Sequence, residues 1–183
     1  MVCNRFKGGI GTSSRVLPAK DGGYIVGVLV QCNYGSRQNV RVAGVPVGRE
    51  INSEDPYAYQ PPPISEQDSI IIVVVTNAPL LPTQLKRLAH RVTLGLGHGG
   101  SISGNDSGDI FIAFSTANSG ASSATKPVDV KMVPNDSLDP IFCRYRRSNG
   151  GSHHQRYDRR RNPRPASKTT TSALCPTINS RQY

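Results

Sequence analysis

The stretch D-S-I-I-I-V-V-V-T-N-A-P-L-L-P, from Asp68 to Pro82, decides the fold of this chain. Its β-branched run predicts a strand over Ser69–Thr76. The run is apolar at every position and not only at alternate ones, which is typical of a strand that is covered on both faces. Ser69 stands at the mouth of this strand, where a hydroxyl is held rigidly and still meets a substrate. We therefore consider Ser69 a candidate nucleophile.

The segments around this strand indicate an α+β fold of layered sheets and helices. After the strand, apolar side chains recur at helical spacing from Leu85 to Leu96, and the glycines within 95–100 end the predicted helix. Pro82 suits the first turn of this helix. Residues 50–67, which contain P-P-P, are predicted to form an extended loop. Further strands are predicted over Tyr24–Tyr34, Val40–Val47, Asp109–Thr116 and Val128–Val133.

Charge divides the chain into two parts near Phe142. The 183 residues carry a net charge of +10, of which residues 1–142 hold 12 Lys+Arg and 11 Asp+Glu. Residues 143–183 hold 10 Lys+Arg and one acid. We therefore expect a near-neutral folded domain over 1–142 and a basic tail over 143–183. The tail has no apolar period, so we expect it to be disordered.

The cysteine and apolar patterns indicate a reduced, cytoplasmic protein. The N-terminus has no apolar signal segment, and the longest apolar run, Ile70–Val75, is too short to cross a bilayer. We expect reduced thiols and no zinc site. His153 and His154 have no matching cluster of acids or cysteines, so no metal or other cofactor is predicted. The scattered cysteines, which form no CxxC pair, are Cys3, Cys32, Cys143 and Cys175.

The segment K-G-G-I-G-T-S-S-R, Lys7–Arg15, has the composition of a phosphate-cradling loop. It lacks the order GxxxxGK[ST], and no clear strand precedes it. A glycine-rich turn whose backbone approaches another segment closely is therefore the favoured interpretation.

Three further polar side chains near the predicted strands are candidate site residues. Ser107 and Asp109 form S-G-D at the start of the next strong strand, and a helix pointing away from both strands would bring them beside Ser69 at a common sheet edge. A carboxylate there can orient a hydroxyl or hold a substrate ammonium group. Asn33, at the end of an earlier strand, can donate its side-chain amide to an oxyanion. Spacing alone leaves open that these serines are ordinary turn residues.

Four motifs follow one another along the chain: F-K-G-G-I-G-T-S-S-R, L-V-Q-C-N-Y-G, S-I-I-I-V-V-V-T-N-A-P-L-L-P-x-Q-L-K-R-L-A and S-G-D-I-F-I-A-F-S-T-A-N. In this order they resemble the L-aminopeptidase/D-esterase family, which includes D-amidases and β-peptidyl aminopeptidases. The resemblance covers about residues 2–142 and implies an α-β-β-α sandwich, present here in part. It makes 1–68 the end of an α-chain-like part and 69–142 the start of a β-chain-like part.

The resemblance also implies a mechanism. Family precursors cleave themselves before a serine that becomes the N-terminal nucleophile, and the matching bond here joins Asp68 to Ser69. Ser107 and Asp109 match the serine and the acid that accompany the nucleophile, and Asn33 matches the asparagine of the oxyanion site. The free α-amino group of Ser69, with an ordinary pKa of about 8, would act as the base. The implied substrates are small peptides, amides or esters. The implied reaction needs no metal, and no membrane partner is expected.

Three departures from the family are expected to impair activity. One is at Asn77, where the family more usually has Asp. The long segment that family precursors carry before K-G-G-I-G is absent, so we expect a truncated chain. After Phe142 the family's acidic helix, with the pattern E-A-T-E-E-A-I-x-N-A, is replaced by an Arg-rich segment. Permitted codons for residues 147–162, read one nucleotide later, restore that helix, so we expect a frameshift. The basic composition would then be an accident of reading frame, which disfavours nucleic acid as a partner.

Two hypotheses about function remain open. The first is a self-processing N-terminal-serine aminopeptidase, amidase or esterase of reduced activity. A family-like homo-oligomer is not favoured for it, because the chain is expected to be truncated. The second is a non-catalytic remnant or binding protein whose basic tail contacts nucleic acid or an acidic surface.

Overall fold

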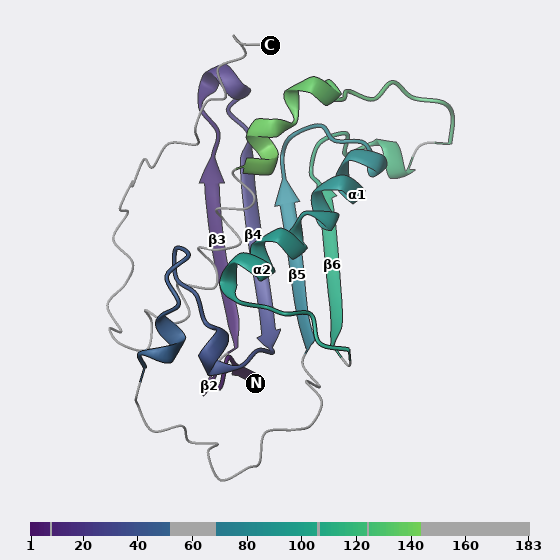
Figure 1. Ribbon diagram of the computed structural model, residues 1–183. Helices are drawn as coiled ribbons and strands as arrows, with labels where there is room; N and C mark the ends of the chain where they lie inside the picture. Colours follow the sequence, from purple (N-terminus) through teal and green to yellow (C-terminus); the bar gives the residue numbers. More distant parts are fainter. Residues whose placement is uncertain (8, 52–68, 106, 124, 144–183) are drawn as a thin grey trace.

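The computed structural model describes residues 1–7, 9–51, 69–105, 107–123 and 125–143, and it contains a four-stranded sheet in the order β3-β4-β5-β6 (Figure 1). The strands of this sheet are β3 (Ile10–Val16), β4 (Ile25–Asn33), β5 (Ser69–Thr76) and β6 (Gly108–Ser115). Two short strands, β1 (Val2–Cys3) and β2 (Phe6–Lys7), form a hairpin before them. Helices α1 (Pro82–His90) and α2 (Val92–Gly99) connect β5 to β6. Single 3₁₀ turns span Ala19–Asp21, Arg37–Asn39, Val47–Arg49, Ala121–Ser123 and Asn135–Ser137.

The predictions for the three strongest strands are confirmed. The bounds of β4, β5 and β6 each lie within one residue of the predicted ones. β5 and β6 pair in parallel because a helical crossover joins them, and β4 pairs antiparallel with both β3 and β5. The α+β class is therefore confirmed.

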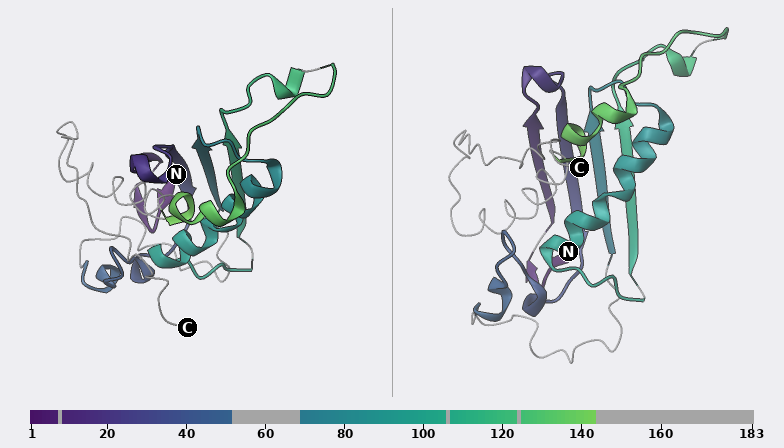
Figure 2. Two further views of the ribbon diagram at one scale, coloured as in Figure 1. Left: turned by 90° about the horizontal axis from the view of Figure 1, so that it is seen from above. Right: turned by 45° about the horizontal axis from the view of Figure 1, so that its top comes forward.

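The helices gather on one side of the sheet, as Figure 2 shows. Side chains alternate between the two faces along each strand, and the face under the helices holds the core. Ile70, Ile72 and Val74 of β5 are buried there, against Leu88 of α1 and Val92 of α2.

The opposite face, called the open face below, has no described α-helix or strand packed against it. None of its residues is charged, and several of its apolar side chains are exposed. The prediction that apolar strands are covered on both faces is therefore wrong for the described part of the chain. The residues of the open face are Ile10, Thr12, Ser14 and Val16 of β3, Ile25, Gly27, Leu29, Gln31 and Asn33 of β4, Ser69, Ile71, Val73 and Val75 of β5, and Gly108, Ile110, Ile112 and Phe114 of β6.

The single predicted helix is present as two consecutive helices. Pro82 is in the first turn of α1, as predicted, and Gln84 Oε1 accepts a hydrogen bond of 3.0 Å from the backbone N–H of Leu81. Gly100 ends α2 with a φ of 105°. A Cβ at this position would collide with the carbonyl oxygen of Asn39, so glycine is required here for its conformation and for its size.

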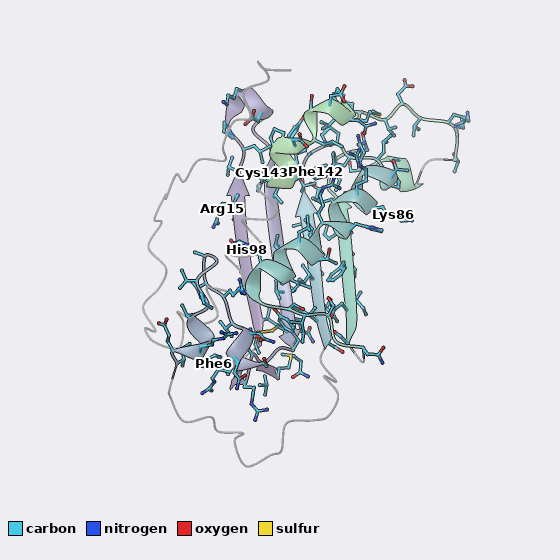
Figure 3. The ribbon with its side chains drawn as sticks, viewed as in Figure 1. Phe6, Arg15, Lys86, His98, Phe142 and Cys143 are labelled. Carbon is cyan, nitrogen blue, oxygen red and sulfur yellow. A yellow bond between two sulfur atoms is a disulfide. The ribbon has the colours of Figure 1, made fainter. Side chains whose placement is uncertain are left out.

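The end of the described chain closes the core over α1. Leu138, Ile141 and Phe142 are buried. Phe142, labelled in Figure 3, lies with its ring centroid 3.9 Å from the guanidinium carbon of Arg91. This contact combines apolar burial with a cation–π interaction.

The strand predicted over Val40–Val47 is wrong. Val42 and Val45 exchange two backbone hydrogen bonds of 3.0 Å, so the segment turns back on itself. Ala43 and Gly44, between them, have φ angles of 53° and 87°. Two consecutive positive φ angles are typical of a type I′ turn, and this local turn outweighs the β-branched composition.

The short strand predicted over Val128–Val133 is wrong as well. The carbonyl of Val133 accepts a hydrogen bond of 2.8 Å from Gln84 Nε2, and its N–H donates to the Pro79 carbonyl at 2.9 Å. These side-chain and loop partners satisfy the backbone groups that a strand would have paired.

The glycine-rich segment Lys7–Arg15 is mostly the edge strand β3 and not a turn. The close backbone approach predicted for it is present, because Gly11 pairs with Val30 of β4. The small residues therefore form a strand whose neighbour supplies its hydrogen bonds.

Several predictions lie outside the described residues. They concern the extended loop, apart from residues 50 and 51, the tail beyond residue 143, and His153 and His154. Among the described helices, none has the length and apolar character needed to cross a bilayer.

Cys3 and Cys32 form a disulfide, with Cα atoms 5.7 Å apart (Figure 3 draws disulfides in yellow). The prediction of reduced thiols is therefore wrong for this pair, and Cys143 is disulfide-bonded as well. The two cysteines are separated by 29 residues and meet because Cys3 forms a parallel bridge with Tyr34, just after the end of β4. Cys3 and Cys32 do not have CxxC spacing, so their pairing is visible only once the chain is folded.

Cys3→Ala is expected to lower the free energy of unfolding by about 2–4 kcal/mol, because the disulfide restricts the unfolded chain. Urea-induced unfolding followed by circular dichroism measures this change. The variant Ser14→Ala, at an exposed position of β3, serves as the control with little expected change. Equal stability of Cys3→Ala and the unmodified chain under oxidising conditions would contradict a stabilising disulfide.

Candidate active site

Ser69 is the first residue of β5, at the end of the sheet where β4 ends and β6 begins. It lies directly opposite Asn33 in the antiparallel register and level with Gly108 in the parallel register. Ser69 and Asn33 are both exposed, and both belong to the open face. Opposed residues on one face have Cβ atoms about 4.5–5.5 Å apart. The Asn33 amide can therefore reach a group that is bound to the Ser69 hydroxyl.

Gly108 leaves room around this hydroxyl. A Cβ at position 108 would lie 3.3 Å from Ser69 Oγ, a tighter contact than most side chains make. In the sequence Gly108 is only the middle residue of S-G-D, because the strand register that brings it beside Ser69 is a product of the fold.

Ser107 and Asp109 form a hydrogen-bonded pair at the same end of the sheet. The Ser107 hydroxyl donates to Asp109 Oδ1 at 2.9 Å. Alternation along β6 places Gly108 on the face of Ser69 and Asp109 on the covered face. Ser69, Ser107 and Asp109 share the predicted edge of the sheet. The Asp109 carboxylate, however, lies on the opposite face of the sheet from the Ser69 hydroxyl.

The Asn33 side chain is oriented by the first residues of the chain. The backbone N–H of Val2 donates to Asn33 Oδ1 at 3.0 Å. With the oxygen engaged in this way, the amide presents its Nδ2 hydrogens as donors. The neighbouring Cys3–Cys32 disulfide ties this N-terminal strand to β4. No sequence signal marked Val2, because its contact depends on β1 folding back against the end of β4.

The opposite end of the sheet carries a hollow of about 610 Å³. It lies between the start of α1 and the end of β6, with Leu81, Leu85 and Phe114 among its lining residues. It is thus separate from the end that carries Ser69. Asp68, the other partner of the predicted cleavage site, lies outside the described residues. Within the described ranges, no three His, Cys, Asp or Glu side chains gather as metal ligands.

Comparison with solved structures defines the class of protein. The chain matches a Burkholderia sp. beta-aminopeptidase with a TM-score of 0.68 and 43% identity, over 83% of this chain and 42% of that one. It matches the L-aminopeptidase D-Ala-esterase/amidase from Ochrobactrum anthropi with a TM-score of 0.71 and 42% identity, over 83% of this chain and 40% of that one. The latter is described as a prototype of the serine aminopeptidases and a variant of the Ntn hydrolase fold. The chain therefore has part of an Ntn hydrolase fold.

Within that class, the chain belongs to Peptidase family S58, whose model matches residues 1–146. It is 46% identical, over 156 residues, to the beta-peptidyl aminopeptidase BapA of Sphingosinicella microcystinivorans, a match that covers 78% of this chain and 38% of the relative. For the enzyme of the same name from Sphingosinicella xenopeptidilytica the identity is 49% over 124 residues, covering 64% and 31%. The resemblance inferred from the four motifs is confirmed. The chain spans less than half the length of these relatives.

Proposed function

We propose that this chain is a self-processing aminopeptidase, amidase or esterase whose nucleophile is Ser69, the N-terminal residue after cleavage. The observation that carries this proposal is the placement of Ser69 directly opposite Asn33, on one face and at one end of the sheet. A hydroxyl and an amide donor in this arrangement can attack a carbonyl and hold the resulting oxyanion. Membership in Peptidase family S58 supports the same activity.

Self-cleavage would begin at the bond between Asp68 and Ser69. The Ser69 hydroxyl attacks the Asp68 carbonyl carbon, the C–N bond breaks, and the nitrogen takes up the hydroxyl proton as an ester forms. Water then hydrolyses the ester. The products are a carboxylate on Asp68 and a Ser69 residue with a free hydroxyl and a free α-amino group.

Turnover would use the same atoms on a substrate. The new α-amino group starts β5 next to Gly108, at the end of the sheet that carries the Ser107–Asp109 pair. It takes the hydroxyl proton as Ser69 attacks the first carbonyl of a peptide, amide or ester, while Asn33 Nδ2 donates to the oxyanion. The leaving amine or alcohol receives that proton, and water releases the acyl group. Asp109 keeps the Ser107 hydroxyl oriented and supplies negative charge for a substrate ammonium group.

The substrate proposal is tested by pairs of p-nitroanilides that differ only at the N-terminus. L-alanyl and β-alanyl p-nitroanilide, each with a free amine, are compared with their N-acetyl derivatives. We expect release of p-nitroaniline from the free amines alone. Equal hydrolysis of the acetylated compounds, or no hydrolysis at all, would contradict an aminopeptidase.

Asp109→Asn is expected to lower kcat/KM by about 100-fold, because the Ser107 hydroxyl loses a charged acceptor and the site loses its negative charge. Steady-state kinetics on the free-amine p-nitroanilide measures this loss. Asp129→Asn, an exposed acid away from the sheet, is the matched control. If both variants kept the unmodified rate, Asp109 would have no part in the reaction.

A cytoplasmic location stays a prediction. The Cys3–Cys32 disulfide is more typical of an oxidising compartment.

A further inference from the structure

Gly108 begins β6 as a glycine that its backbone conformation does not require. A glycine paired in a sheet contributes no side chain to the packing, and it often marks a place that a ligand approaches closely. The φ angle of Gly108 is not positive, so its backbone is one that residues with a side chain also adopt. The reason for a glycine here therefore lies in the space beside it.

The Ser69 hydroxyl borders that space. Among the described residues other than its chain neighbours, a Cβ at position 108 would meet one atom within 4 Å, which is Ser69 Oγ at 3.3 Å. Gly27, on the same face of the sheet, is different. A Cβ there would meet the Val75 side chain at 3.0 Å, so packing within the sheet accounts for that glycine. The side chain that Gly108 lacks leaves room next to the proposed nucleophile.

Asn33 and Gly108 lie on opposite sides of Ser69. The sheet order places Asn33 on the neighbouring strand β4 and Gly108 on the other neighbour, β6. Neighbouring strands are about 4.8 Å apart, so each residue is within reach of a group bound to the Ser69 hydroxyl. When Asn33 Nδ2 donates to the oxyanion, that oxygen is directed towards β4. The other substituents of the attacked carbon are then directed away from β4, on the side of Gly108.

The acyl part of the substrate is the substituent that suits this side. In the substrate of an aminopeptidase the acyl residue carries a free ammonium group. Asp109, the residue after Gly108 in β6, supplies negative charge for that group in the proposed reaction. A substrate that turns its ammonium group towards β6 therefore places its first residue over Gly108.

We propose that Gly108 determines which acyl groups the site accepts, because it leaves the space for the side chain of the substrate's first residue. This inference rests on the proposed function of Ser69 and adds the size of the acyl group to it. With glycine at position 108, the site accepts first residues that are larger than glycine. A methyl group at this position would fill the space beside Ser69 Oγ and exclude the larger ones.

The test compares Gly108→Ala with the unmodified chain on glycyl and leucyl p-nitroanilide, the latter as a mixture of both enantiomers. The unmodified chain is expected to hydrolyse both compounds. In Gly108→Ala, the kcat/KM for the leucyl compound relative to the glycyl compound is expected to fall by about 10-fold or more, since one methylene in a binding pocket changes discrimination by about 10–200-fold. This ratio, taken within one preparation, does not depend on the fraction of chains that have cleaved themselves.

A second glycine provides the matched control. A Cβ at Gly97 of α2 would meet no described atom within 4 Å, and its φ angle is not positive, so Gly97→Ala should leave the ratio unchanged. The urea unfolding midpoint of Gly108→Ala is expected to be unchanged, which separates an effect of size from a loss of fold.

The outcomes distinguish this inference from the proposed function. If the unmodified chain hydrolyses neither compound, the proposed function is contradicted and the inference falls with it. If the unmodified chain is active, three results would overturn the role of Gly108 alone. They are an unchanged ratio in Gly108→Ala, an equal loss of both activities in that variant, and an unmodified chain that accepts only the glycyl compound.

Discussion

Ser69→Ala is expected to abolish self-cleavage and to reduce hydrolysis of free-amine p-nitroanilides by at least about 10³-fold. The alanine side chain has no oxygen to attack the carbonyl of residue 68 or of a substrate, whereas the sheet around it is unchanged because Ser69 is exposed. A denaturing gel reports the cleavage, and absorbance at the p-nitroaniline band reports the hydrolysis. The variant should run as one intact chain where the unmodified protein gives two pieces.

Two controls separate nucleophile loss from a general effect. Ser14→Ala removes another exposed serine hydroxyl from the open face and is expected to leave cleavage and hydrolysis unchanged. Ser69→Thr retains a hydroxyl and is expected to restore part of the cleavage. Full cleavage in Ser69→Ala would rule out Ser69 as the nucleophile, whatever the kinetics.

Ile72→Ala is expected to lower the free energy of unfolding by about 2–5 kcal/mol. Ile72 is fully buried at the centre of β5, with Val30 and Phe111 as its register neighbours on β4 and β6. Removing three carbon atoms there leaves a cavity that β-sheet hydrogen bonds prevent from closing. Urea unfolding followed by circular dichroism gives the change.

The size of the side chain should set the size of this effect. Ile72→Val is expected to cost about 0.5–1.5 kcal/mol, and Leu94→Ala, at an exposed position of α2, should change stability by less than about 0.5 kcal/mol. A similar loss for Ile72→Ala and Leu94→Ala would contradict the assignment of the helix-covered face as the core.

The parts of the fold that were predicted correctly are those in which local pattern and tertiary environment agree. The run Ser69–Thr76 is strongly β-forming and lies at the centre of the sheet, so pattern and structure coincide to the residue. Where a local turn or a distant partner decides the structure, composition alone is misleading. The valines around Ala43 and Gly44 form a turn, and Val133 is held by Gln84.

The candidate site also has a part that could be predicted from the sequence and a part that needed the fold. The motifs identified Ser69, Asn33, Ser107 and Asp109, and the structure places all of them at one end of the sheet. The relation between them needed the strand register, which puts Asn33 opposite Ser69 and Asp109 on the other face. The role of Val2 could not be predicted, because no local pattern marks a backbone N–H that orients a side chain 31 residues away.

The most direct measurement is N-terminal sequencing of the purified, denatured protein. If Ser69 is the self-generated N-terminal nucleophile, two sequences are expected: one from the start of the chain and one reading Ser-Ile-Ile-Ile-Val, residues 69–73. The second sequence should be missing from Ser69→Ala. A single sequence from the start of the chain alone would contradict the proposed maturation and the catalytic role of Ser69 that depends on it.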